Sequence, residues 1–183
     1  MTDGADSALL TYILLTLTTN SIYVITSSVS KHCSDVHRAV RTLNKIMDLT
    51  NNHNVYHILD YSGDTNNIFN ATTELMRVHA IDVVYTGTNA TPPAGHKMYE
   101  KYKNTPEMVK RDPYVQRDQV YNDQVIVPFT NLDKRKIKDL YVHFGIIETV
   151  YPMTFSCLHV DREFQCGTCP ECEERMYGFG NLN

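Results

Sequence analysis

The sequence contains no long run of apolar residues. Its longest such run, ALLTYILLTL at residues 8–17, has about half of the roughly 20 residues that a membrane-spanning helix needs. Asp3 and Asp6 precede this run, whereas a secretory signal begins with basic residues. We therefore expect a soluble, cytoplasmic protein that has no membrane partner.

An excess of positive charge is also absent. The 183 residues include 17 Lys and Arg against 21 Asp and Glu, which gives a formal net charge of −4. This balance provides no general attraction to nucleic acid, so we do not expect nucleic acid as a partner. The chain also lacks internal repeats and low-complexity tracts. Its length and its 42% apolar content suit one compact domain with a small appendage.

Cysteine is scarce outside one C-terminal segment, CLHVDREFQCGTCPEC at residues 157–172, which holds four of the five cysteines. In a reducing compartment such clustering indicates metal binding rather than disulfides. Two overlapping C-x-x-C turns and one more distant thiolate can supply four tetrahedral ligands. The segment therefore predicts a structural Zn²⁺ site. Its ligands would be Cys157, Cys166, Cys169 and Cys172.

Three other interpretations of this segment remain open from the residues alone. The cysteines can hold an iron–sulfur cluster, form a redox-active C-x-x-C pair, or be reduced thiols that cluster by chance. His159 can compete as a ligand, although four thiolates already fill a tetrahedral shell.

Helical and strand patterns alternate along the first 150 residues. Helical spacing of apolar residues predicts helices at 6–19, 36–47, 68–76 and 133–144, and β-branched runs predict strands at 22–29, 55–61, 82–87 and 125–129. This alternation predicts a doubly wound α/β domain with a parallel sheet at 1–150, followed by a four-cysteine zinc-binding module at 151–183. Residues 88–124 show no periodicity and are predicted to form a functional or mobile loop that can hold the substrate.

The chain opens with MTDGADSALL, in which a Gly, an Asp and a Ser come directly before an apolar helix. A loop that enters a helix N-terminus offers backbone N–H groups and a positive dipole end to phosphates. Such a loop normally follows a strand, and only Met1 precedes the loop here. We therefore expect that Met1 is an internal residue of a longer product, or that another chain, such as the second subunit of a homodimer, supplies the strand.

The loop and the cysteine segment together resemble the 7-cyano-7-deazaguanine synthases, a family of PP-loop ATP pyrophosphatases. The loop TDGADS (2–7) is similar to the S-G-G-x-D-S pyrophosphate loop at Gly4, Asp6 and Ser7, with Thr2 a near match. The strings SC (156–157) and CGTCPECEER (166–175) resemble the zinc module of the family. VPFTNLDKRKIKDLYVHFGI (127–146) resembles its proline-containing strand, Lys-x-x-Ile helix start and Gly-ended helix.

The resemblance implies a Rossmann-like fold and an ATP-dependent ligase. This enzyme converts 7-carboxy-7-deazaguanine and ammonia to 7-cyano-7-deazaguanine through adenylated intermediates, in queuosine-type deazapurine biosynthesis. It implies that ATP and Mg²⁺ bind at the loop. The residues of this loop are Thr2, Asp3, Gly4, Ala5, Asp6 and Ser7.

The resemblance also implies three catalytic residues. Asp6 would hold the loop or contact Mg²⁺, Ser7 would donate its hydroxyl, and Lys134 would stabilise charge on the phosphates. From the residues alone, Asp6 also suits a helix cap and Lys134 a solvated surface charge.

Departures from the family pattern leave other functions open. Asp3 replaces a Gly, and a carboxylate about 4 Å from a phosphate oxygen costs on the order of 4 kcal/mol at an effective dielectric of about 20. Residues 87–104 lack the usual substrate-pocket strings, and Asn89 and Thr91 suit either substrate contacts or a turn. The alternatives are a related PP-loop enzyme that adenylates another carboxylate or a tRNA base, and a catalytically weakened relative with a binding role.

Two further features have ordinary interpretations beside functional ones. Cys33 suits a sulfur carrier, as in thiolating relatives, or a small buried residue. The basic residues between Lys97 and Arg117 alternate with tyrosines and acidic residues, which favours a solvated loop over a site for an acidic ligand.

Overall fold

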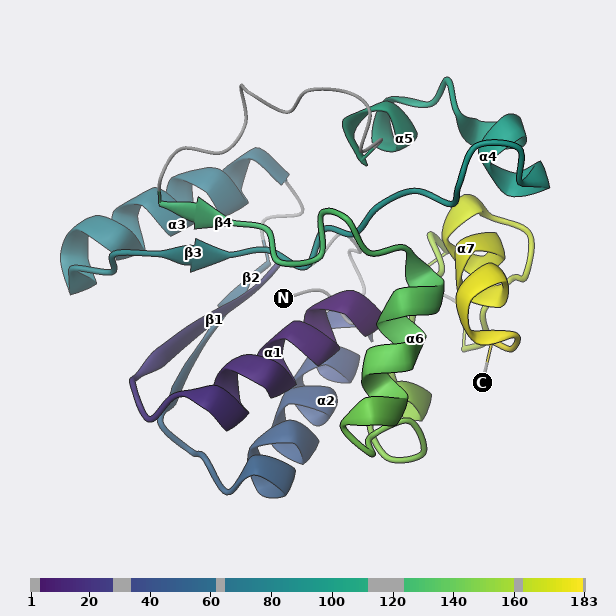
Figure 1. The fold of residues 1–183 in the computed structure, drawn as a ribbon. Helices are drawn as coiled ribbons and strands as arrows, with labels where there is room; N and C mark the ends of the chain where they lie inside the picture. The colour runs from purple at the N-terminus through teal and green to yellow at the C-terminus, as the bar shows by residue number, and fades with distance from the viewer. Residues whose placement is uncertain (1–3, 28–33, 62–64, 112–123, 160–162, 183) are drawn as a thin grey trace.

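The computed structural model describes residues 4–27, 34–61, 65–111, 124–159 and 163–182 (Figure 1). Within these ranges the helices are α1 (Ala5–Leu17), α2 (Ser34–Thr50), α3 (Thr65–His79), α4 (Lys97–Tyr102), α5 (Pro106–Arg111), α6 (Lys134–His143) and α7 (Pro170–Phe179), with a 3₁₀ turn at Tyr151–Met153. The strands are β1 (Ile22–Ser27), β2 (Val55–Asp60), β3 (Val84–Tyr85) and β4 (Val125–Ile126).

The strands form two parallel pairs. β1 pairs with β2 in a register that sets Ile22 opposite Val55, and β3 pairs with β4 with Val84 opposite Val125. The α/β class with parallel strands is therefore confirmed. The single doubly wound sheet is not observed in the described residues, because each pair is a separate two-stranded sheet.

The main core forms around α1. This helix is apolar on nearly every face, and such a helix must be covered on several sides. It packs against α2 and α6, and its buried Leu9 lies in one cluster with Ile46 of α2 and Tyr141 of α6. Phe179 of α7 joins the same cluster and stacks on Tyr151, with the ring centroids 4.0 Å apart. The helix of the cysteine segment is thus anchored in the core of the α/β part.

The predicted loop at 88–124 is wrong over residues 97–102 and 106–111, which form α4 and α5. Each of these helices has only six residues, too few to show a helical period in the sequence. The His96 imidazole caps α4 by accepting a hydrogen bond from the N–H of Met98, whose side chain is buried. Residues 112–123 of the predicted loop lie outside the described part of the chain.

The ends of α6 follow from its flanking residues. The carboxylate of Asp133 accepts hydrogen bonds from the backbone N–H groups of Arg135 and Lys136, at 3.0 and 3.1 Å. After the helix, Gly145 has a φ of +67°, a conformation that glycine adopts without strain. These signals place Lys134 in the first turn.

Within the described ranges, no helix is both long enough and apolar enough to cross a membrane.

Candidate active site and cysteine cluster

A pocket of about 260 Å³ lies at the carboxyl end of β1. The first turns of α1, α2 and α6 meet the start of α7 around it, and Figure 1 shows the first turn of α1 beside the start of α6. In α/β proteins with parallel strands, ligands bind at this edge. The pocket is lined by Gly4, Asp6, Thr26, Ser27, Asp35, Asn89, Arg111, Lys134, Phe155, Ser156, Cys157, Leu158, Glu171 and Glu174.

The structure brings two of the predicted catalytic residues together in this pocket. Nζ of Lys134 donates a hydrogen bond to Oδ2 of Asp6, and their side chains are only 7% and 17% exposed. Lys134 is therefore not a solvated surface charge. Asp6 is not a helix cap either, because Gly4 is the N-cap of α1 and the Asp6 side chain pairs with Lys134.

Other predicted residues of the loop lie differently. Ser7 is in the first turn of α1, where its carbonyl accepts a hydrogen bond from the Thr11 hydroxyl, and it does not line the pocket. Ala5 is buried, and its carbonyl accepts a hydrogen bond from the Tyr141 hydroxyl at 2.8 Å. The predictions for Thr2, Asp3 and Cys33 fall outside the described residues.

At two glycines, the backbones of neighbouring segments around the pocket come too close together to leave room for a side chain. A Cβ on Gly87, which follows β3, would lie 3.1 Å from the Asp6 carbonyl carbon and from the Ser7 nitrogen. A Cβ on Gly178 of α7 would lie 2.8 Å from the carbonyl carbon and oxygen of Lys134. The absence of a side chain at these positions therefore lets α1 and α6 meet the β3 loop and α7.

Arg111 connects the loop after β3 to α7. Its Nε donates to the carbonyl of Asn89 at 3.1 Å and its Nη2 to the carbonyl of Ala90 at 3.3 Å. The same guanidinium pairs with both carboxylate oxygens of buried Glu174. Burial opposes ionisation of Glu174, but the charges of Arg111 and Lys134 outweigh it and hold the pKa of Glu174 below its usual value.

Sequence reasoning missed this connection. It placed Arg111 in a solvated loop, whereas the side chain is only 21% exposed. Arg111 and Glu174 are 63 positions apart in the sequence, and no sequence motif relates the two positions. The cysteine spacing assigns Glu174 to the zinc-binding module, but it does not predict that Glu174 pairs with Arg111.

The pocket holds more negative than positive charge. Four carboxylates line it, and its two cations, Arg111 and Lys134, are both paired with carboxylates. Among the described residues, Oδ1 of Asp6 and Oε2 of Glu171 are buried without a hydrogen-bond partner. Burial also raises the pKa of Glu171. Two buried carboxylate oxygens without partners fit a hard divalent cation such as Mg²⁺.

The four C-terminal cysteines lie close together beside the pocket. All four sulfurs are within 4.8 Å of one another, with 3.9 Å between Cys166 and Cys172 and 4.0 Å between Cys157 and Cys169. Sulfurs placed about 2.3 Å from a zinc ion at tetrahedral angles lie about 3.8 Å apart, so the cluster can hold a zinc ion. His159 contributes its backbone N–H to the Cys157 sulfur, and its side chain is exposed.

Backbone N–H groups donate hydrogen bonds to the sulfurs of Cys157 and Cys166. The N–H of Cys166 donates to the Cys157 sulfur at 3.4 Å, and the N–H of Cys169 donates to the Cys166 sulfur at 3.3 Å. A hydrogen bond from the N–H of Thr168 is the largest influence on Cys166 and lowers its pKa to about 5. Burial acts in the opposite direction on the other two thiols and raises the pKa of Cys169 and of Cys172. Metal ligation needs thiolates, so a bound cation would have to hold these two buried sulfurs in the charged form.

A buried arginine fixes α7 to the segment before Cys157. Arg175 is fully buried, and its Nη2 donates to the carbonyls of Tyr151 and Thr154, each at 3.2 Å. Its Nη1 donates to the hydroxyl of Ser156. Cys157 belongs to the cluster and also lines the pocket, so the cluster forms part of one wall of the candidate active site.

The family model of queuosine biosynthesis protein QueC matches residues 100–183. This part of the chain is QueC-like. The resemblance to the 7-cyano-7-deazaguanine synthases, a PP-loop family, is confirmed over these residues. The match includes Lys134, Arg111, Glu174 and the four cysteines, whereas the loop at 2–7 lies outside it. No curated protein matches the chain.

Proposed function

We propose that this protein is an ATP-dependent ligase that converts 7-carboxy-7-deazaguanine and ammonia to 7-cyano-7-deazaguanine through adenylated intermediates. The product would serve queuosine-type deazapurine biosynthesis. One observation carries the proposal: Lys134, from the QueC-like part, pairs with Asp6 of the phosphate-loop sequence, and both residues line one pocket. The pocket thereby joins the matched part of the chain to the segment whose sequence resembles the pyrophosphate loop.

Binding of the nucleotide follows from the groups at the first turn of α1. A phosphate that enters beside Gly4 meets the backbone N–H groups of this helix end and the ammonium of Lys134. Lys134 then exchanges the Asp6 carboxylate for phosphate oxygens. Asp6 and Glu171 would hold Mg²⁺, which offsets the negative charge of the pocket and of the phosphates.

The proposed reaction uses ATP twice. A carboxylate oxygen of the substrate attacks the α-phosphorus and releases pyrophosphate, and ammonia then displaces AMP to give the amide. Adenylation of the amide oxygen, followed by loss of AMP and a proton, gives the nitrile. In both adenylations Lys134 and the first turn of α1 stabilise the charge that develops on the phosphates.

We further propose that Cys157, Cys166, Cys169 and Cys172 bind one Zn²⁺ in a structural role. Four thiolates leave no open position for substrate or water, which is the arrangement of structural zinc sites. The zinc would keep Ser156 and Cys157 in place at the wall of the pocket.

A third element of the proposal concerns the sheet. A strand between β1 and β3 would join the two pairs in the order β2, β1, added strand, β3, β4, which is the doubly wound order. We propose that another segment or another chain, such as a second subunit, supplies this strand. The ATP site then lies at the carboxyl ends of the joined strands.

The test is a product analysis with ATP, Mg²⁺, ammonium and 7-carboxy-7-deazaguanine. We expect AMP, pyrophosphate and the nitrile, with the amide as an intermediate. ADP as the sole nucleotide product would contradict the adenylation chemistry. A parallel reaction without ammonium should stop after the first adenylation, which provides the control.

Two alternatives are tested by the same assay. Exchange of labelled pyrophosphate into ATP with a different carboxylate, or with tRNA, would indicate a related PP-loop enzyme with another substrate. A weakened relative with a binding role is favoured by one observation, namely that carboxylates already pair with both cations of the pocket. That relative would show no ATP binding.

A further inference from the structure

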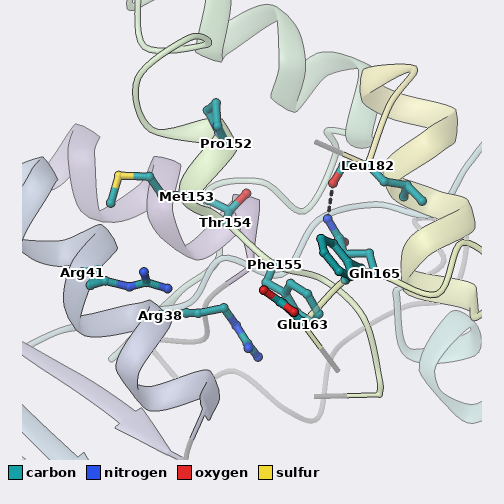
Figure 2. Close-up of a pocket in the computed structure, with 10 residues that line it drawn as sticks. Arg38, Arg41, Pro152, Met153, Thr154, Phe155, Glu163, Gln165 and Leu182 are labelled. Atoms are coloured by element: carbon teal, nitrogen blue, oxygen red, sulfur yellow. Dashed lines mark hydrogen bonds between the residues drawn. The ribbon is translucent and has the colours of Figure 1, made fainter. Parts of the chain in front are cut away.

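A second and larger pocket lies on the other side of Phe155. Its volume is about 480 Å³, and Figure 2 shows the residues that line it. Phe155 lines both pockets. Ligand pockets for small molecules typically measure about 300–1,000 Å³, so this one has room for a molecule of nucleotide size. It is lined by Arg38, Arg41, Pro152, Met153, Thr154, Phe155, Glu163, Phe164, Gln165 and Leu182.

One wall of this second pocket is cationic. Arg38 and Arg41 lie one turn apart on α2, so they share a face of the helix. The guanidinium of Arg38 stacks on the Phe155 ring, 4.0 Å from its centroid. Among the described residues Arg41 has no hydrogen-bond or ion-pair partner, and Figure 2 shows its side chain extending from α2 along the pocket.

The opposite wall offers a carboxylate and an aromatic ring. Gln165 fixes this wall, because its Oε1 accepts from the Ser156 N–H and its Nε2 donates to the Leu182 carbonyl. Glu163 has no partner within the described part of the chain. The Phe164 side chain is 76% exposed beside it.

We propose that this second pocket binds a guanine mononucleotide, with its phosphate on Arg38 and Arg41. Guanidinium groups match phosphate oxygens with paired, charge-assisted hydrogen bonds. The exposed ring of Phe164 suits a planar base, because aromatic side chains stack on bases, whereas the Phe155 ring holds the Arg38 guanidinium in place. Glu163 accepts hydrogen bonds from the N–H groups along the guanine edge, and adenine lacks the amino donor next to its ring nitrogen.

The experiment measures GMP binding to the full chain by isothermal titration calorimetry. Arg41→Ala removes one phosphate partner from an exposed position, so the chain should fold and lose about tenfold or more in GMP affinity. The matched control is Lys45→Ala, which removes a charge one turn further along α2 outside the pocket and should leave the affinity unchanged.

A second pair of measurements tests the role of Glu163. The unchanged chain should bind GMP more tightly than AMP, and Glu163→Gln should reduce this preference. Absence of GMP binding at millimolar concentration, or equal affinities of Arg41→Ala and the unchanged chain, would overturn the site. Inorganic phosphate or AMP binding as tightly as GMP would overturn recognition of the base.

Discussion

At the scale of single residues, the Lys134–Asp6 pair decides the character of the candidate active site. The two residues are 128 positions apart, and each is held by its own helix start. Taking both charges out of water is costly, and the pair is tolerated because each charge has its partner. A single replacement leaves the other charge buried and unpaired.

The first prediction concerns Lys134→Ala. We expect loss of ATP turnover together with a fall in unfolding free energy of about 3 kcal/mol, since Asp6 would remain buried without a partner. Urea unfolding and the product assay measure both effects. Lys136→Ala is the control, because its pair with Asp139 is exposed and contributes little. Unchanged stability in Lys134→Ala would show that the pair is not buried in solution.

A second prediction at this scale concerns His57 on β2, whose Nε2 is 2.8 Å from the Thr26 hydroxyl. Burial lowers the pKa of His57 below its usual value. The unfolded chain therefore takes up the proton first, so the contribution of neutral His57 to stability is present above the unfolded pKa. This contribution is lost as pH falls from about 7 to about 5.

The measurement is unfolding free energy across that pH window. His57→Asn should flatten the slope, whereas His53→Asn, at an exposed position, should not change it. A slope that is identical in the His57 variant and the unchanged chain would remove this residue as the cause.

At the scale of elements, α7 connects the cysteine cluster to the candidate active site and to the core. Arg175 and Phe179 pack it against Tyr151, and Glu174 connects it to α5 through Arg111. The first turn of this helix carries Cys172, so a metal at the cluster acts directly on the helix start. Loss of the metal should therefore loosen the residues that form this wall of the candidate active site.

The third prediction is that the chain binds one zinc ion and that Cys169→Ser loosens residues 155–176. Structural zinc contributes an apparent 10–16 kcal/mol, on the order of values for zinc-finger peptides, to local folding. Hydrogen exchange should rise across this segment and stay unchanged in α3, which packs against β1. Elemental analysis that finds no metal in freshly purified, reduced protein would rule out the site.

At the scale of the whole molecule, the separation of the two strand pairs leaves strand edges that can pair with another chain. A two-stranded sheet satisfies only part of the hydrogen-bonding capacity of its strands, and strand edges invite further pairing. The exposed faces add to this tendency, because Tyr56 and Tyr85 are 53% and 42% exposed.

The fourth prediction is that the 183-residue chain associates as its concentration rises and binds magnesium–ATP weakly. Light scattering after size exclusion measures the first property, and calorimetry measures the second. Addition of a strand that pairs with β1 and β3 should improve both. A stable monomer with tight magnesium–ATP binding would show that the site is complete with two separate strand pairs.

Much of the fold could be predicted because its signals are local. The apolar spacing from Val36 to Met47 lies within α2, and Gly145 ends α6 as expected. The strands were harder to delimit, since β3 and β4 have only two residues each. Helices as short as α4 and α5 leave no period to detect.

The sequence by itself determined the alternation of helices and parallel strands, the QueC-like C-terminal part and the four cysteines as a unit. These features depend on spacings of a few residues, where chain geometry leaves little freedom. The cysteine spacing in particular places four sulfurs in reach of one ion before any long-range packing is known.

Only the tertiary structure decided which charges are buried and with which partners. The sequence around Lys134 does not distinguish a solvated lysine from one that pairs with Asp6. Arg111 stands in a polar stretch of the sequence, and yet its side chain pairs with buried Glu174. Burial depends on which distant segments pack over a side chain, and pair formation depends on that burial. Segments brought together by the packing of α1 on α6 and of α6 on α7 therefore define the site.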